Sequence, residues 1–264
     1  MGRSDMGGKT ALVTGSVGGL GYAIAEALAA AGCRIVLNGL EGAEAGEAAR
    51  HRLSEAYGVD VSFHGADLSR ASEIEALVAR TQADFGRIDI LVNNAVVRQF
   101  GLIEDMDPAG WDRSMAVNLT APFHLVRLCL PGMKARGFGR IVNVASIYSL
   151  IGATHRADYV TTKTGMIGLT RAVALETAEF DITCNAICPG SVPTKAITDK
   201  IAGLASQAGI SADEATRDYL ATRQPSRRFI APEGVAAMVA FLCGPGGRDI
   251  TGATLPLDGA WSIS

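Results

Sequence analysis

Tyr159 and Lys163 lie four positions apart, and together they could transfer a proton. The stretch around them has helical spacing, and residues four apart lie on one face of a helix, so the ammonium group can sit near the phenol. A free tyrosine has a pKa of about 10 and is a poor base at neutral pH. A neighbouring cation lowers that pKa because it favours the phenolate. The pair is therefore typical of acid–base chemistry on a hydroxyl or carbonyl group.

Two further polar residues are placed to join this pair. Ser146 ends a β-branched run thirteen residues before Tyr159. Asn118 lies inside a predicted helix, where asparagine is unfavourable because its amide competes for backbone hydrogen bonds. That cost suggests a task, although an ordinary solvated or core amide would also explain it. Tyr-x-x-x-Lys alone occurs by chance in many proteins, so the pattern gains its force from Ser146 and Asn118.

A glycine-rich stretch near the amino terminus indicates where a nucleotide would bind. Gly15, Ser16, Gly19, Leu20 and Gly21 follow the first predicted strand and open the first predicted helix. Glycines let backbone N–H groups approach a pyrophosphate, which also meets the positive end of the helix dipole. The alternative is a tight turn without a ligand, but the position between strand and helix favours dinucleotide binding. No Gly-Lys-Ser/Thr follows, so phosphoryl transfer by a Walker loop is not supported.

The hydrophobic pattern predicts the frame that must position these residues. Short β-branched runs alternate with longer amphipathic runs. Strand character occurs in Thr10–Val13, Arg34–Leu37, Val59–Phe63, Ile88–Val92, Arg140–Val144, Ile182–Ile187 and Ala253–Leu257. Helical spacing occurs in Leu20–Ala31, Glu44–Tyr57, Ser72–Phe85, Ala109–Arg136, Ala157–Glu179 and Pro232–Leu242. Alternation of this kind predicts a parallel sheet with helices on both faces, because a parallel crossover needs a dozen or more residues.

We therefore expect an α/β fold of the doubly wound Rossmann type, with a seven-stranded parallel sheet in one domain over 1–264. A (β/α)8 barrel is the competing architecture, but only seven strand candidates occur and the first turn is rich in glycine. The segment 194–229 is long for a simple connection and has mixed charge. Insertions after a strand's carboxyl end lie over the ligand crevice of open α/β sheets, so we expect this segment to be a lid.

Composition excludes several other classes of function. The 24 Lys and Arg residues against 27 Asp and Glu leave a net charge of −3, which predicts neither nucleic acid nor an anionic membrane as a partner. No apolar run approaches the roughly 20 residues that span a bilayer, and Met1–Lys9 lacks the apolar stretch of a secretory signal, so we expect a cytoplasmic protein. The five cysteines include no Cys-x-x-Cys pair. We expect them to be reduced core residues, and we expect no metal site.

Across Lys9 to Trp261 the chain resembles the classical short-chain dehydrogenase/reductase family. The resemblance rests on the spacing G-x-x-x-G-x-G and on the following residues: Asn93-Asn94-Ala95, Asn118, Ser146, Tyr159, Lys163 and Pro189-Gly190. It implies that Tyr159 exchanges a proton with the substrate hydroxyl and that Ser146 hydrogen-bonds the developing oxyanion. It implies that Lys163 holds the nicotinamide ribose and lowers the Tyr159 pKa, and that Asn118 anchors a water relay to solvent.

The same resemblance implies further cofactor contacts. They are Asp67, Leu68, Asn94, Ala95, Pro189, Gly190, Val192 and Thr194. Asp67 resembles the residue that contacts adenine in the family, although Asp67-Leu68-Ser69 could equally cap the next helix. The family normally has glycine where Val96 stands, so a side chain fills space near the cofactor, and we expect activity to survive this change.

The choice between NAD and NADP depends on the end of the second strand and on charge in the glycine loop. A 2′-phosphate requires a nearby Arg or Lys, whereas a free 2′-OH is usually held by Asp or Glu. The strand ends in Asn38-Gly39-Leu40, and no basic residue lies between Thr14 and Ala31. Nothing in this region neutralises an extra phosphate, so NAD is favoured, although the acidic residue that would settle the choice is not evident.

Within the family, several stretches resemble the 3-hydroxybutyrate dehydrogenase branch, among them Leu102-Ile103-Glu104-Asp105 and Gln224-Pro225-Ser226. Four positions depart from the polar set with which that branch binds a carboxylate. Arg98 and Lys200 each stand where that branch has Gln. Tyr148 stands in place of His, and Arg156 stands in place of Lys. The added charge predicts a pocket for an anion stronger or larger than a lone carboxylate, such as a dicarboxylate, sulfonate or phosphonate. The alternative is that these cations are solvated surface charges.

The sequence thus predicts a cytoplasmic, NAD-dependent dehydrogenase that acts on the secondary alcohol of a small anionic substrate. An NADPH-dependent 3-oxoacyl-thioester reductase and a sugar or polyol dehydrogenase are the alternatives among enzymes. A nucleotide-sensing binding protein that kept the fold and lost the chemistry is the alternative outside them. The family resemblance also implies a homotetramer, with one interface on the helices after strands four and five and another on Gly252–Trp261.

Overall fold

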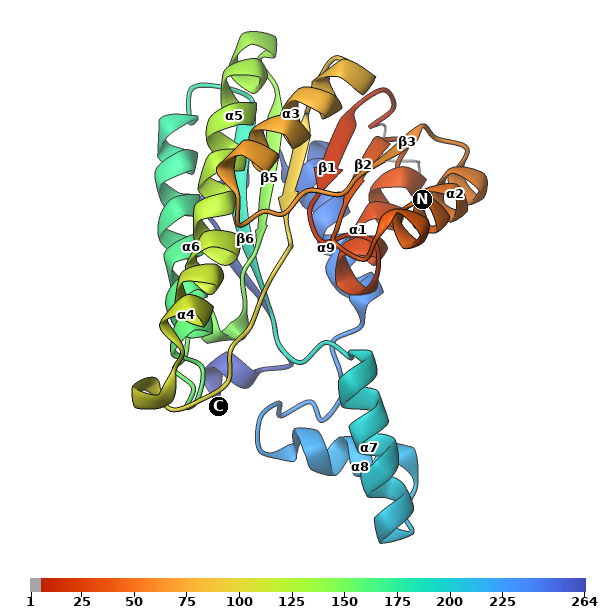
Figure 1. Ribbon diagram of the computed structural model, residues 1–264, viewed down its shortest axis with the longest axis vertical. Helices are drawn as coiled ribbons and strands as arrows, with labels where there is room; N and C mark the ends of the chain where they lie inside the picture. Colours follow the sequence, from red (N-terminus) through yellow and green to blue (C-terminus); the bar gives the residue numbers. More distant parts are fainter. Residues whose placement is uncertain (1–5) are drawn as a thin grey trace.

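The computed structural model describes residues 6–264, apart from the side chain of Ala196, and is built around one parallel sheet (Figure 1). Its seven strands are β1 (Thr10–Val13), β2 (Arg34–Asn38), β3 (Val61–His64), β4 (Ile90–Asn93), β5 (Gly139–Val144), β6 (Ile182–Pro189) and β7 (Thr254–Leu257). They pair in parallel in the order β3-β2-β1-β4-β5-β6-β7. The predicted doubly wound Rossmann-type sheet is therefore confirmed, with strand boundaries that differ by one or two residues.

Helices cover both faces of the sheet (Figure 1). One face carries α1 (Gly19–Ala30), α2 (Ala43–Tyr57) and α9 (Pro232–Cys243), and the other carries α3 (Ala71–Phe85), α5 (Ala121–Arg136) and α6 (Ala157–Glu176). Successive residues of a strand point to opposite faces, so Val13 packs in the core beneath α1 while Leu12 packs in the core beneath α3 and α5. Because both faces are buried around the central strands β1 and β4, these two strands are nearly continuous apolar runs.

The strand order reverses between β1 and β4, which pair directly although they are far apart in sequence. Just past their carboxyl ends, the Thr14 hydroxyl accepts hydrogen bonds from the backbone N–H groups of Asn94 (2.9 Å) and Ala95 (3.1 Å). These bonds hold the glycine loop against the loop that follows β4. In open α/β sheets ligands bind at this reversal, so the loops that leave these strands define the expected crevice.

The helix predicted as one element over Ala109–Arg136 is interrupted. The structure has α4 (Pro108–Met115), then a π-helical turn over Ala116–Thr120, and then α5. Pro122 has no N–H, so the α-helical hydrogen bond to the carbonyl group of Asn118 cannot form, and the backbone widens at that point. The helix predicted to reach Glu179 also ends early, at Glu176.

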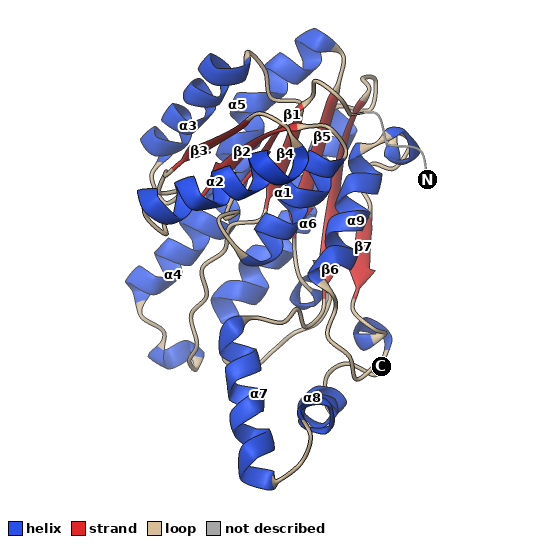
Figure 2. Ribbon diagram, turned by 90° about the vertical axis from the view of Figure 1, so that its right-hand side faces the viewer, coloured by secondary structure: helices blue, strands red, loops and turns tan. Residues whose placement is uncertain are grey.

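The segment 194–229 forms two helices, α7 (Lys195–Ala208) and α8 (Ala212–Ala221). Figure 2 shows them beyond the carboxyl ends of β6 and β7, outside the layers that cover the sheet. The two helices share a small apolar core of their own, which includes Ile201, Ala205 and Ala215. The remaining short 3₁₀ turns are Ile103–Asp105, Ile147–Ser149, Pro245–Gly247 and Trp261–Ile263. Within residues 6–264, none of the helices combines the length and the apolar character that a bilayer crossing requires.

Candidate active site

A cavity of about 520 Å³ opens at the carboxyl edge of the sheet. A hollow of about 160 Å³ adjoins it beyond the end of β2. Of the catalytic, cofactor and substrate residues predicted from the sequence, those that line the larger cavity are Gly15, Gly19, Leu20, Gly21, Asn94, Ala95, Arg98, Ser146, Tyr148, Arg156, Tyr159, Lys163, Pro189, Gly190, Val192 and Thr194. The smaller hollow is lined by others of the set: Asn38, Gly39, Leu40, Asp67 and Leu68. The structure thus brings together nearly all of them, and leaves Ser16, Asn118 and Lys200 outside the lining.

The glycine loop has the shape that a phosphate-binding cradle needs. Gly15 and Gly19 adopt φ values of +60° and +57°, which residues with side chains rarely adopt. A methyl group at Gly21 would clash with the carbonyl oxygen of Gly15, whereas open space surrounds Gly18 and Gly19. The backbone at the start of α1 is therefore bare toward the cavity, as a nicotinamide dinucleotide with its pyrophosphate at a helix N-terminus requires. The residues present fit such a cofactor.

Two predicted cofactor residues are committed to the protein itself. The Ser16 hydroxyl donates to Val13 O (2.7 Å) and accepts from Asn38 N–H (3.1 Å). The Asn38 amide donates to His64 O (3.0 Å) and Ala66 O (3.2 Å), which ties β2 to the end of β3. Both side chains are buried, so they shape the hollow from behind.

Sequence reasoning missed Glu41, which lines both the cavity and the hollow. A methyl group at Gly39 would collide with the Glu41 carboxylate, so this carboxylate lies directly over the bare backbone that ends β2. The residue comes three positions after the end of the strand, where the usual pattern does not look for an acidic group. Its only sequence signal is that it is the first carboxylate after the β2 turn.

Asp67 forms a tight turn with Ser69 and lines the hollow, and it does not cap α3, whose N-cap residue is Arg70. Its Oδ1 accepts hydrogen bonds from the backbone N–H (2.9 Å) and the hydroxyl (2.8 Å) of Ser69. These bonds, first from the backbone and then from the hydroxyl, together with the charge of Arg113, hold the pKa of the Asp67 carboxyl below its usual range. Asp67 therefore presents a carboxylate to the hollow, with Arg113 on the same lining.

Tyr159 is buried at the floor of the cavity. Burial by itself raises the pKa of its phenol, but the charges of Lys163 and Arg98 and hydrogen bonds with Ser146 and Arg98 outweigh that effect and bring the pKa below its ordinary value. The Lys163 Nζ lies 5.8 Å from the centroid of the tyrosine ring and the Arg98 Cζ lies 5.1 Å from it. The phenol is therefore flanked by two cations, one of which the Tyr-x-x-x-Lys pattern predicts.

Lys163 is held in place by a hydrogen bond to the end of β5. It is fully buried, and its Nζ donates to the carbonyl oxygen of Val144 at 2.6 Å, at the end of β5. Burial lowers the pKa of Lys163, and the neighbouring Tyr159 opposes that shift because it stabilises the ammonium form. A buried cation without a carboxylate partner is costly unless another anion compensates it, and the Tyr159 phenolate, when it forms, is such an anion.

Ser146 begins a tight turn that aims its hydroxyl at the cavity. Its Oγ accepts from Tyr148 N–H (3.2 Å), while its own N–H donates to the Ser149 hydroxyl (3.3 Å). The Ser149 hydroxyl donates in turn to the backbone carbonyl of Lys163 (2.8 Å), so the turn after β5 is tied to α6. The serine and the Tyr/Lys pair are therefore fixed relative to one another.

Asn118 lies outside the lining of the cavity and holds the loop that follows β4. Its Oδ1 accepts from Val97 N–H and its Nδ2 donates to Val97 O, both at 2.9 Å, with a longer bond to the Thr162 hydroxyl at 3.3 Å. The π-helical turn widens the helix at this residue and leaves the amide facing the loop. The structure therefore shows Asn118 as a clamp. Its water relay remains an expectation from the family resemblance.

An aromatic wall closes one side of the cavity. The Tyr148 ring meets the Tyr159 ring edge-on at 6.2 Å between centroids and meets the Trp261 ring at 5.6 Å. The Arg156 Cζ lies 4.3 Å from the Phe100 ring centroid and 5.7 Å from that of Tyr148. Arg156 is thus stacked between two rings and lines the cavity, so it differs from a freely solvated charge. Trp261 was not selected from the sequence.

The segment 194–229 contributes different cations from the one predicted. Lys200 is exposed on α7, with its Nζ 5.9 Å from the Tyr219 ring centroid, and it does not line the cavity. Lys195 and Arg223 line it instead, together with Tyr219. Side-chain direction on a helix decides between Lys195 and Lys200, and the sequence showed no helix here to assign it from.

Val96 stands where the family pattern has glycine, and it lines the cavity and the hollow. It is 37% exposed, and it is not among the described residues with positive φ. Its branched side chain therefore sits on an ordinary backbone and needs no strained conformation. The expectation that activity survives this change stays a prediction.

Comparison with known proteins gives a consistent result. The model of the short chain dehydrogenase family matches residues 9–205. The chain is 44% identical over 256 residues to a D-beta-hydroxybutyrate dehydrogenase of Cupriavidus necator, which covers 97% of this chain and 98% of that protein. It is 40% identical over 254 residues to a D-beta-hydroxybutyrate dehydrogenase of Rhizobium meliloti, with 96% and 98% covered. Among solved structures, L-sorbose reductase of Gluconobacter frateurii, complexed with NADPH and L-sorbose, is similar with a TM-score of 0.93, at 29% identity and 99% of each chain.

Proposed function

The chain belongs to the short chain dehydrogenase family, and from that premise we propose that it transfers a hydride between NAD and the secondary alcohol of a small anionic hydroxy acid. Its similarity to D-beta-hydroxybutyrate dehydrogenases places the reaction on a hydroxyl group. The observation that carries the proposal is the Tyr159 phenol, which lies in the cavity with Lys163 and Arg98 beside it and with Ser146 on the same lining.

The mechanism follows from the groups around the phenol. In alcohol oxidation the Tyr159 phenolate accepts the hydroxyl proton, and the charge of Lys163 favours the phenolate by lowering the pKa of the phenol. The Ser146 hydroxyl donates a hydrogen bond to the substrate oxygen, on which negative charge develops. A nicotinamide dinucleotide, held with its pyrophosphate at the glycine loop, would supply the hydride acceptor. The proton then leaves Tyr159 through the relay that the family resemblance assigns to Asn118.

NAD as the preferred cofactor is supported by Glu41. Its carboxylate lies over Gly39 at the end of β2, where it could accept a hydrogen bond from a free ribose 2′-OH and would repel a 2′-phosphate. The basic residue on the same hollow is Arg113, and its charge acts on the Asp67 carboxyl. The complex of L-sorbose reductase contains NADPH, so the similar structure does not by itself favour NAD.

An anionic substrate is supported by the charges of the cavity. Arg98, Arg156, Lys195 and Arg223 line its substrate side, and none of them forms an ion pair across the cavity with a carboxylate of residues 6–264. Lys195 alone is paired, with Asp199 on its own helix. Arginine binds carboxylate, sulfonate and phosphonate oxygens with a bidentate fork, so we propose a 3-hydroxybutyrate-like acid or a more strongly anionic analogue as substrate.

The experiment is an initial-rate panel of NAD reduction with 3-hydroxybutyrate, a hydroxydicarboxylate, a hydroxyalkyl sulfonate, a hydroxyalkyl phosphonate and a neutral secondary alcohol, repeated with NADP. A preference for the anions with NAD supports the proposal. Oxidation of NADPH by L-sorbose, with no preference for the anions in the panel, would favour the second candidate, a sugar reductase, which the structural similarity to L-sorbose reductase supports. Equal rates with NAD and NADP would remove the assigned role of Glu41.

Two further expectations belong to this proposal. We propose a homotetramer, supported by apolar side chains that lie exposed on α5 and α6, namely Phe123 (48%) and Leu175 (80%). We propose that segment 194–229 acts as a lid within a single domain, because it has its own core and presents Lys195 and Arg223 to the cavity. Light scattering of the purified chain measures the first, and protection of the segment from proteolysis by NAD with substrate measures the second.

A further inference from the structure

Arg98 sits on a loop that is clamped on both sides of it. Asn118 bonds both backbone groups of Val97, the residue before it, at 2.9 Å. The Asp158 Oδ2 accepts from the backbone N–H of Gln99, the residue after it, at 3.1 Å. The two clamps come from different elements, the π-helical turn and the start of α6. The loop that carries Arg98 is therefore fixed to the helices that surround the cavity.

The hydrogen bond from Gln99 to Asp158 depends on a buried carboxylate, which costs free energy. Asp158 is fully buried, and its Oδ2 also accepts from the Ser114 hydroxyl at 2.6 Å. Burying a carboxylate without a cationic partner is costly, and proteins retain such groups where they hold a specific arrangement. Asp158 directly precedes Tyr159 on α6, so the bond to Gln99 sets the position of Arg98 relative to the tyrosine. A solvated surface arginine needs no such support.

The Arg98 guanidinium reaches the tyrosine itself. Its Cζ lies 5.1 Å from the ring centroid, and its positive charge lowers the pKa of the phenol. Guanidinium has five N–H donors, so this group can also bind an anion in the cavity that Arg98 and Tyr159 both line.

The other groups that face the phenol or its lysine complete the electrostatic setting. From the turn after β5 come the Ser146 hydroxyl and the Tyr148 ring. From β6 comes Cys188, near Lys163, and burial raises the pKa of its thiol to about 11, so it is neutral. The Asp158 carboxylate is engaged by Ser114 and Gln99. The charged groups that act on the phenol are thus Lys163 and Arg98.

We propose that Arg98 is a positioning residue that acts through Tyr159: it stabilises the phenolate as a second cation, and a substrate anion bound to the same guanidinium weakens that stabilisation. The anion site and the proton on the phenol are thereby coupled. The inference rests on the proposed function and deepens it. In oxidation the hydroxyl proton moves to the Tyr159 oxygen while the hydride leaves the carbinol carbon for NAD, so the step needs the phenolate that Arg98 favours.

The sign of the effect follows from the charge. Without Arg98 the pKa of Tyr159 rises, because one of its two cationic neighbours is gone. The acid limb of the oxidation rate then moves to higher pH. An anion on Arg98 has the same direction of effect in the wild-type protein, because it offsets the guanidinium charge.

The first experiment titrates the phenolate by ultraviolet difference absorbance in the cofactor-free full chain, with Tyr159→Phe as the blank. We expect Arg98→Gln to raise the pKa of Tyr159 by about one unit, a tenfold change in its ionisation constant. Arg98→Lys should retain most of the wild-type value. Arg156→Gln is the matched control, because it removes a cation from the same cavity that does not act on Tyr159, and it should leave the titration unmoved.

The second experiment repeats the titration with malonate, a dicarboxylate without a hydroxyl group. Malonate should raise the Tyr159 pKa in the wild type and leave it unchanged in Arg98→Gln. If Arg98→Gln raises KM for the acid but the titration and the pH limb stay in place, Arg98 is an anion contact only and the coupling is overturned. Turnover that survives in Tyr159→Phe would instead overturn the proposed function itself, so the two failures are distinguishable.

Discussion

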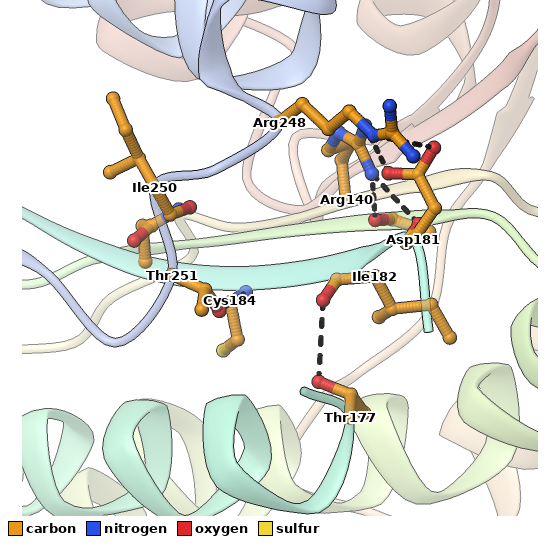
Figure 3. A network of polar contacts seen from close by, with 10 residues as sticks. Arg140, Thr177, Asp181, Ile182, Cys184, Arg248, Ile250 and Thr251 are labelled. Atoms are coloured by element: carbon orange, nitrogen blue, oxygen red, sulfur yellow. Dashed lines mark hydrogen bonds and ion pairs between the residues drawn. The ribbon is translucent and has the colours of Figure 1, made fainter. Parts of the chain in front are cut away.

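Charged side chains are paired differently at the two edges of the sheet. At the amino edge, Asp181 lies before β6 and accepts from Arg140 at 2.8 Å, with Arg248 at 3.7 Å (Figure 3). Asp89 lies before β4, fully buried, and pairs with Arg87 at 2.6 Å and Arg136 at 3.5 Å. Each buried charge at this edge therefore has its counter-charge within the protein.

At the carboxyl edge, Lys163, Arg98 and Arg156 form no ion pair with a carboxylate of the described residues. Lys163 is fully buried there, so its charge would be costly in a resting scaffold. The difference indicates two roles for charge. At the amino edge the ion pairs within the chain stabilise the fold, whereas the unpaired cations around the cavity can interact with the Tyr159 phenolate and with an anionic ligand. The predictions below test that distinction, beginning with the largest effect.

Tyr159→Phe should lower kcat/KM for the preferred acid by about 1000-fold, because it removes the proton acceptor of the reaction. NAD affinity, measured by fluorescence titration, should stay near the wild-type value, since the aromatic ring and Lys163 remain. Stability in urea should also be retained. A variant with full turnover would mean that the carboxyl edge does not carry the chemistry assigned to it.

Asp181→Ala should lower the free energy of unfolding by about 3 kcal/mol, because Arg140 is 3% exposed and loses its counter-charge. Urea unfolding measures it, and kcat under native conditions should be unchanged. Arg248→Ala is the matched control: that side chain is 67% exposed, and its removal should cost under about 0.5 kcal/mol. Loss of turnover in Asp181→Ala without loss of stability would contradict the division between the edges.

Arg156→Gln should raise KM for 3-hydroxybutyrate about tenfold with a smaller change in kcat, because it removes a charged contact that the ground state and the transition state share. Steady-state kinetics with the acid and with a neutral secondary alcohol separate the effect. The neutral alcohol should show no change. Equal effects on both substrates would indicate that Arg156 only supports the stack of Phe100 and Tyr148.

Glu41→Gln should weaken NAD binding about fivefold and leave NADP binding unchanged or improved, because it removes an acceptor worth about 1 kcal/mol and a negative charge. Calorimetric titration with both cofactors gives the two affinities. Glu44→Gln provides the matched control, since Glu44 is exposed on α2 and lines neither the cavity nor the hollow. Identical behaviour of the two variants would remove Glu41 from the cofactor site.

Local patterns predicted most of the fold. Buried strands and amphipathic helices have periods that a short window of sequence reveals, and the elements around Gly15 and around Tyr159 appear where the pattern placed them. The interruption at Ala116–Thr120 was not predicted, although Pro122 lies in the sequence with its missing N–H. The helices of segment 194–229 were also missed, because their mixed charge hides a small core that forms only when α7 packs on α8.

The candidate site divides in the same way. Spacing alone places Tyr159 and Lys163 on one helical face, and the glycines that open α1 are recognisable because their need for bare backbone is local. Glu41, Trp261 and Arg223 have no such signal. Each reaches the cavity through a loop or helix whose direction depends on packing with distant parts of the chain.

The sequence by itself determined the doubly wound sheet, the phosphate loop and the Tyr/Lys pair, because each depends on backbone geometry within a few consecutive residues. Only the tertiary structure decided which charges meet. Asn118 and Asp158 hold Arg98 beside Tyr159 across separations of 21 and 59 residues to the loop that carries it. Electrostatic interactions fall off over a few ångströms of space whatever the distance along the chain, so the second cation on the phenol becomes visible only in the folded molecule.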